Sequence, residues 1–193
     1  DIRSDINLNN LKLANSYELK KFFPNIKKEI IFKNQKLKVE YKKDDLRLVG
    51  NGDIILQDKV DKIKYEFLKK KNLFKLNSTL NIQDDPFEID LINYKKKDDL
   101  EIIVNVIKEK NKKIVFNEIS LKENSNIISL EDLVFSNDYK VYDIKKVNIN
   151  YLDKDNLKNK LELIKNNKDY SLIGSSFSAD NIIDKLLNSD NDE

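Results

Sequence analysis

Three short stretches carry residue types that could bind a phosphate, activate a hydroxyl or hold a cation. Residues 50–53 (Gly-Asn-Gly-Asp) are similar to a phosphate-binding loop, but the stretch lacks a third glycine and is followed by three aliphatic residues instead of a helix. A bend or bulge in a strand is the better interpretation. Residues 174–176 (Gly-Ser-Ser) do not match the turn that presents a nucleophilic serine, and the chain has no histidine to activate one.

The third stretch contains Asp153, Asp155 and Glu162, whose spacing invites comparison with a calcium loop. Leu157 takes the third ligand position and no glycine follows it, so we expect a solvated turn. The whole chain has no His and no Cys, which excludes a serine–histidine–aspartate triad, a thiolate nucleophile and a zinc site with the usual ligands. We therefore expect no enzymatic activity, no metal and no other cofactor.

Charged residues alternate in sign along the chain. The 36 basic and 34 acidic side chains leave a net charge of +2, and all of the basic residues except Arg3 and Arg47 are lysines. Lysine lacks the two-pronged guanidinium that favours recognition of bases and phosphates. We interpret these charges as a solvated face and expect no nucleic-acid partner.

The elements around these stretches are predicted to be strands, because hydrophobic residues alternate with polar ones at a period of two. Polar clusters separate the runs at intervals of roughly 8 to 14 residues, which leaves no room for crossover helices. The sequence thus predicts an all-β fold of about ten antiparallel strands in up-and-down order. Candidate turns lie at 44–45, 51–53, 84–85, 97–99, 111–113, 124–126, 137–138, 153–155 and 166–169. Residues expected to share a face within each strand are Leu37, Val39 and Tyr41; Phe74, Leu76, Leu80 and Ile82; Phe87, Ile89 and Leu91; Leu100, Ile102, Val104 and Val106; Ile114 and Phe116; Ile128 and Leu130; Leu133 and Phe135; Val147, Ile149 and Tyr151; and Leu157, Leu161 and Leu163.

Two segments break this period and predict short helices. Residues 16–23 place Ser16 as the N-cap and end at Pro24. Residues 179–188 follow Ser178 and carry an apolar stripe at helical spacing that includes Ile183, and we expect this helix to pack on the sheet. We expect residues 1–188 to form one β-rich segment of a larger protein and residues 189–193 to be a disordered tail.

Ten strands with one apolar face each need more cover than two short helices supply. The sheet could pack on a second sheet as a sandwich, close into a barrel, or curl into an open groove filled by a ligand with hydrocarbon chains. Alternation fits all three arrangements, because each needs one apolar and one polar face.

Both ends of the chain resemble elements of AsmA-like bacterial envelope proteins, especially the YhdP type. The C-terminal match is a strand-to-helix element with 170–174 (Tyr-Ser-Leu-Ile-Gly) and 177–179 (Phe-Ser-Ala). The N-terminal match is a helix ending in 22–24 (Phe-Phe-Pro), followed by strands and 48–54 (Leu-Val-Gly-Asn-Gly-Asp-Ile). The family usually carries Asp before the Ala, where this chain has Ser178.

The resemblance implies a curled antiparallel up-and-down sheet with an open apolar groove, in the periplasm of a Gram-negative cell. It implies a bridge-like lipid-transport segment that holds phospholipid acyl chains, belongs to a longer chain and is anchored to the inner membrane through a segment outside these residues. The alternative is a non-enzymatic β-sandwich that serves as a structural or interaction module of a bacterial surface protein. The residues expected to line the lipid groove are Leu76, Leu80, Ile82, Phe87, Ile89, Leu91, Leu100, Ile102, Val104, Val106, Ile149 and Leu161.

Overall fold

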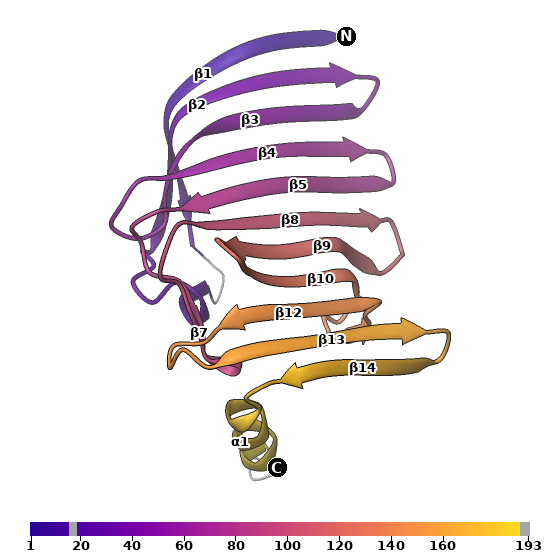
Figure 1. Ribbon diagram of the computed structural model, residues 1–193. Coiled ribbons are helices and arrows are strands. Elements are labelled where there is room, and N and C mark those ends of the chain that lie inside the picture. Colours follow the sequence, from indigo (N-terminus) through magenta and orange to yellow (C-terminus); the bar gives the residue numbers. More distant parts are fainter. Residues whose placement is uncertain (16–18, 190–193) are drawn as a thin grey trace.

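The computed structural model describes the backbone of residues 1–15 and 19–189, with side chains through residue 184. Eleven strands follow one another in chain order across one large sheet, and every neighbouring pair is antiparallel (Figure 1). They are β1 (Ile2–Ala14), β2 (Glu29–Lys42), β3 (Asp45–Ile55), β4 (Asp61–Lys70), β5 (Leu73–Ile82), β8 (Leu100–Glu109), β9 (Ile114–Glu123), β10 (Asn126–Phe135), β12 (Lys146–Leu152), β13 (Lys158–Asn166) and β14 (Asp169–Ser176). A short strand, β11 (Val141–Asp143), also pairs with β10.

The sheet is open, because β1 and β14 lie at opposite ends of the strand order and do not pair with each other. The predicted antiparallel up-and-down order is confirmed. Strands β1 and β4 were not predicted, although Ile63, Tyr65 and Phe67 of β4 alternate as a half-buried strand requires. The predicted turns at 44–45, 111–113, 124–126 and 166–169 connect neighbouring strands.

The polar cluster at 51–53 is not a turn, because it lies inside β3. The irregularity is on the facing strand β2, where the register shifts between Lys33 and Lys36. Asn34 has a φ of 51°, and the 1%-exposed Gln35 donates through Nε2 to the carbonyl oxygen of Asp53 at 2.7 Å. A Cβ at Gly52 would lie 2.4 Å from that nitrogen, so the glycine leaves room for the bulged side chain.

The two ends of the strands differ in their connections (Figure 1). We call the end with the hairpin turns at 43–44, 71–72, 110–113 and 167–168 the tip end. We call the opposite end, where the longer connections 15–28, 56–60, 83–99 and 153–157 gather, the loop end. Segment 83–99 contains β6 (Glu88–Ile89), the 3-10 turn η2 (Asp90–Ile92) and β7 (Tyr94–Lys95), and β6 and β7 form a second, two-stranded sheet.

The hydrophobic core lies under these connections at the loop end. Phe87 packs edge-on against Phe23 with ring centroids 5.2 Å apart, and Tyr94 packs edge-on against Tyr151 at 5.5 Å. They cover sheet residues such as Ile82, which is fully buried. The remaining buried members of this core cluster are Ile54, Leu56, Leu100, Leu121, Ile128 and Ile149.

Two predicted elements need correction. Residues 87–91 do not form a half-buried strand, because the chain crosses from β5 to β8 at the loop end and folds over the core instead. In the predicted helix 16–23, the described part is one 3-10 turn, η1 (Leu19–Lys21), whereas Ser16 lies outside the described residues.

The C-terminal helix α1 (Asp180–Ser189) is confirmed and begins one residue later than predicted. It contacts η2, and Asn181 donates through Nδ2 to the carbonyl oxygen of Asp90 at 2.6 Å. Ile183 is 50% exposed, so the expectation that this side chain packs on the sheet is wrong. The side chains of 185–189 and the predicted tail 190–193 lie outside the described residues.

Candidate functional site

An apolar row crosses seven strands of the sheet near the tip end. Its members are paired in register from β2 to β10, so their side chains lie on one face, the same face as the core. At the usual strand spacing of about 4.8 Å, the row is about 29 Å long. We call Val39, Leu48, Phe67, Leu76, Val106, Phe116 and Leu133 the apolar row.

The apolar row lacks the cover that the loop end has. None of its members belongs to the buried core cluster. In the described part of the chain, strands β2 to β10 pack mainly against their neighbours in the sheet, and no second sheet or helix lies over the row. Val106 and Leu133 are 8% exposed and the other five members are partly buried, whereas Phe74, two residues nearer the tip of β5 than Leu76, is 37% exposed. The row is thus a dense apolar surface of partly buried side chains over which no second layer of the described chain lies.

Two aromatic contacts stiffen this surface. The rings of Phe67 and Phe74 pack edge-on with centroids 5.1 Å apart, and those of Phe116 and Phe135 do so at 5.6 Å. Between the row and the core, Tyr65 lies over Gly50, where an added Cβ would be 2.4 Å from the ring. These contacts hold large aromatic side chains against one another on the apolar face.

Nine of the twelve predicted groove residues share this face, but they divide between core and surface. Leu76 and Val106 belong to the apolar row, and Val104 lies next to it on β8. Ile82, Leu100 and Ile149 are buried core residues, whereas Leu80, Ile102 and Leu161 pack partly against the core.

The other three predicted groove residues leave the sheet. Phe87 is buried among the covering aromatics, Ile89 lies in β6, and Leu91 lies in η2 with 40% of its surface exposed. The predicted groove omitted the other five members of the apolar row. Val39, Phe116 and Leu133 were predicted only as strand residues, and Leu48 and Phe67 were missed although they alternate with polar neighbours.

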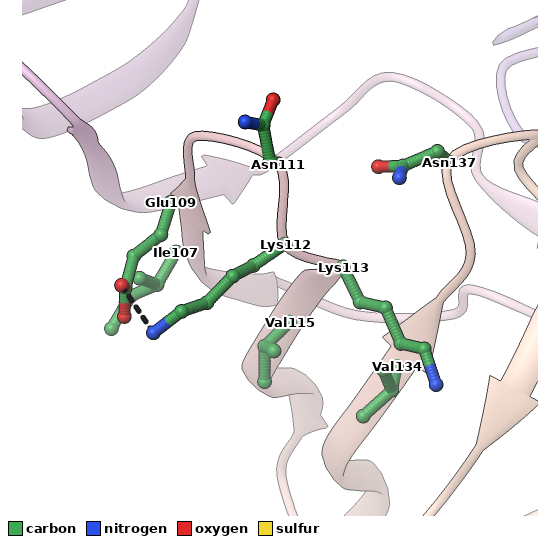
Figure 2. A pocket seen from close by; sticks show the side chains of 8 residues that line it. All are labelled: Ile107, Glu109, Asn111, Lys112, Lys113, Val115, Val134 and Asn137. Atoms are coloured by element: carbon green, nitrogen blue, oxygen red, sulfur yellow. Dashed lines mark ion pairs between the residues drawn. The ribbon is translucent and has the colours of Figure 1, made fainter.

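A second candidate site is a hollow on the opposite face of the sheet at the tip end (Figure 2). It is open to solvent and measures about 520 Å³, and Ile107, Val115 and Val134 form its apolar floor. Lys112 pairs with Glu109 across its rim at 2.6 Å. Its floor is three side chains wide, so it offers far less apolar surface than the row.

Ionisable groups are buried at the loop end, away from the apolar row. Asp61 is 1% exposed, and its Oδ1 accepts a hydrogen bond from the Gln83 backbone N–H at 3.1 Å. Its Oδ2 has no hydrogen-bond partner within the described ranges. Burial raises the pKa of Asp61 to about 6.

Glu123 is also buried but is fully hydrogen-bonded. Its oxygens accept hydrogen bonds from the backbone N–H groups of Lys97 and Asp98, from Asn126 Nδ2 at 3.1 Å and from the Tyr94 hydroxyl at 3.1 Å. Burial raises the pKa of this carboxyl, but the hydrogen bonds outweigh burial and hold it below its ordinary value. Glu123 therefore fastens segment 94–98 to the β9–β10 hairpin.

In residues 1–15 and 19–189, no group of three or more His, Cys, Asp or Glu side chains has the geometry to hold a metal ion. Within the same ranges, no helix has the length and hydropathy needed to cross a bilayer. No protein-family model, curated protein or solved structure matches this chain.

Proposed function

We propose that this chain is a lipid-transport segment that holds phospholipid acyl chains on the apolar row and the neighbouring part of the same face. The observation that carries the proposal is a continuous apolar surface that spans seven strands without a covering layer. Soluble proteins rarely leave large apolar patches uncovered, and such patches mark binding surfaces. Each buried methylene of a bound chain contributes about 0.8 kcal/mol.

In this account no residue performs chemistry. Acyl chains replace water over the apolar row, and headgroups stay in solvent at the tip end. The open β1 and β14 edges fit a sheet that continues in a longer chain. The resemblance to AsmA-like proteins suggests the periplasm of a Gram-negative cell, with an inner-membrane anchor elsewhere in the protein.

The alternative is an interaction module whose partner protein covers the same face. An apolar surface on a partner protein would bury the apolar row just as acyl chains would, and this supports the alternative. A bound lipid and a bound protein differ in mass and in extraction by organic solvent, so one experiment separates them.

Native mass spectrometry of the purified chain, before and after addition of a single-chain phospholipid, tests the proposal. We expect bound phospholipid. The double variant Phe67→Thr/Leu76→Thr removes a cross-strand pair of the row and should weaken binding at least about tenfold, because each lost side chain contributes about 1.5–3 kcal/mol of burial.

The matched control is Leu68→Thr/Lys75→Thr, the adjacent cross-strand pair on the opposite face of the same two strands. Threonine suits strands, so both variants should keep their β circular dichroism. Equal lipid binding by both double variants, or a protein dimer without lipid, would contradict the proposal.

A further inference from the structure

The row next to the apolar row, toward the tips, contains two lysines on the apolar face. The in-register partners Lys69, Phe74 and Lys108 lie on β4, β5 and β8, so the two lysines flank the exposed Phe74 ring. Their other neighbours in this row are Leu46 and Ile114. Each lysine thus lies between two apolar side chains, and neither of these neighbours can form an ion pair with it.

Within the described residues, neither Lys69 nor Lys108 forms an ion pair. Other tip-end lysines do: Lys70 pairs with Asp45 at 3.7 Å, and Lys112 pairs with Glu109. Over the same part of the chain, Lys43, Lys71 and Lys110 of the tip turns also form no ion pair; Lys69 and Lys108 differ from these in lying on the apolar face of the sheet.

The positions of the two lysines suit one shared anion. Two strand spacings separate Lys69 from Lys108, about 10 Å between backbones. Each side chain is a flexible four-carbon stem with a compact ammonium, so both can reach inward over Phe74 to one phosphate.

The charge distribution of the chain points to the same end. Tip segments 42–45, 69–72, 108–113, 136–145 and 165–169 contain 13 lysines and 6 acidic residues, whereas loop-end segments 15–28, 56–61, 83–99 and 153–157 contain 9 lysines and 11 acidic residues. A cluster of one sign attracts the opposite charge over about a Debye length. An anionic amphiphile would therefore orient with its headgroup at the tips.

We propose that Lys69 and Lys108 bind the headgroup of an anionic phospholipid whose acyl chain lies on the apolar row. This inference rests on the proposed function and adds headgroup selectivity to it. The lysines set which lipids bind well, and the apolar row supplies the binding that all of them share.

The test compares two single-chain lipids with the same acyl chain, lysophosphatidylglycerol and lysophosphatidylcholine, by titration at low salt. The unmodified chain should bind the anionic lipid about tenfold or more tightly, since each lysine near an anionic headgroup contributes measurably. In the double variant Lys69→Gln/Lys108→Gln, the ratio of the two dissociation constants should fall to about one, and binding of the zwitterionic lipid should be unchanged.

The control Lys64→Gln/Lys75→Gln removes two lysines from the opposite face of β4 and β5 with the same change in net charge, and it should keep the preference. Equal loss in both double variants would mean that net charge acts, not this pair, and would overturn the inference. An unmodified chain that binds both lipids equally would overturn it as well. Failure of both lipids to bind would instead contradict the proposed function. Inorganic phosphate alone should compete poorly, because it lacks the acyl chain; strong competition would mean an anion site independent of lipid and would also overturn the inference.

Discussion

The buried Asp61 gives a sharp test of the packing at the loop end. The change is Asp61→Asn, which keeps the shape of the side chain but removes its ionisation. The pKa of the folded protein's carboxyl is about 6 against an ordinary 3.8, because burial disfavours the charged form. Two units of pKa difference correspond to about 3 kcal/mol at most.

The direction of this pH dependence of stability depends on whether the folded or the unfolded chain loses the Asp61 proton at lower pH. The unfolded chain releases this proton near pH 3.8 and the folded chain near pH 6, so stability falls as pH rises between these values. The penalty is absent below about pH 4 and constant above about pH 7. Asp61→Asn should therefore gain stability relative to the unmodified chain on going from pH 4 to pH 8, by up to about 3 kcal/mol.

Urea unfolding of both proteins at several pH values measures this difference. An unpartnered amide in the variant shifts its stability equally at every pH, so the pH dependence of the difference isolates the carboxyl. The exposed neighbour Asp84, changed to Asn, serves as the control. A difference between Asp61→Asn and the unmodified chain that is constant from pH 4 to pH 8 would refute the reasoning.

Three further predictions concern stability and are read from thermal or urea unfolding. Glu123→Gln should lower the free energy of unfolding by about 2–4 kcal/mol at pH 7, because it weakens charge-assisted hydrogen bonds to two backbone N–H groups. This loss should shrink as pH falls through the depressed pKa of Glu123. An unchanged unfolding midpoint at pH 7 would contradict the prediction. Ile82→Ala should lose about 2–5 kcal/mol and the half-exposed Ile183→Ala about 0.5 kcal/mol or less, whereas similar losses would mean that α1 docks more tightly than described. Gly50→Ala should lose about 1–3 kcal/mol by displacing the Tyr65 ring, and the loss should shrink in a Tyr65→Ser background; an undiminished loss would point to the backbone instead.

The sequence predicts the repeating part of the fold well, because alternation and turn residues act locally. Strands β8 to β10 and their turns follow directly from period-two patterning. Strand β1 was harder to predict, because at the edge of the sheet residues such as Ile2 and Ile6 stay exposed and its pattern resembles a polar loop. Segment 83–99 was mispredicted because its hydrophobic residues meet Phe23, which lies some sixty positions earlier.

The candidate surface was also only partly predictable from the sequence. Alternation places Leu76 and Ile82 on one face, but it does not distinguish the uncovered residue from the buried one. That difference depends on which end of the strands the long connections cover. The burial of Asp61 and the pairing of Glu123 likewise come from contacts between distant segments, for which single-chain patterning carries no signal.

The most direct test of the central claim asks which face of the sheet a lipid touches. The chain has no tryptophan, so Phe67→Trp and Leu68→Trp each introduce one reporter, at adjacent positions on opposite faces of β4. Each variant is titrated with a phospholipid that carries bromine, a contact quencher, on its acyl chain. Lipid on the apolar row predicts strong quenching of the reporter at position 67 and little at position 68. Equal quenching at both positions, or stronger quenching at 68, would contradict the account.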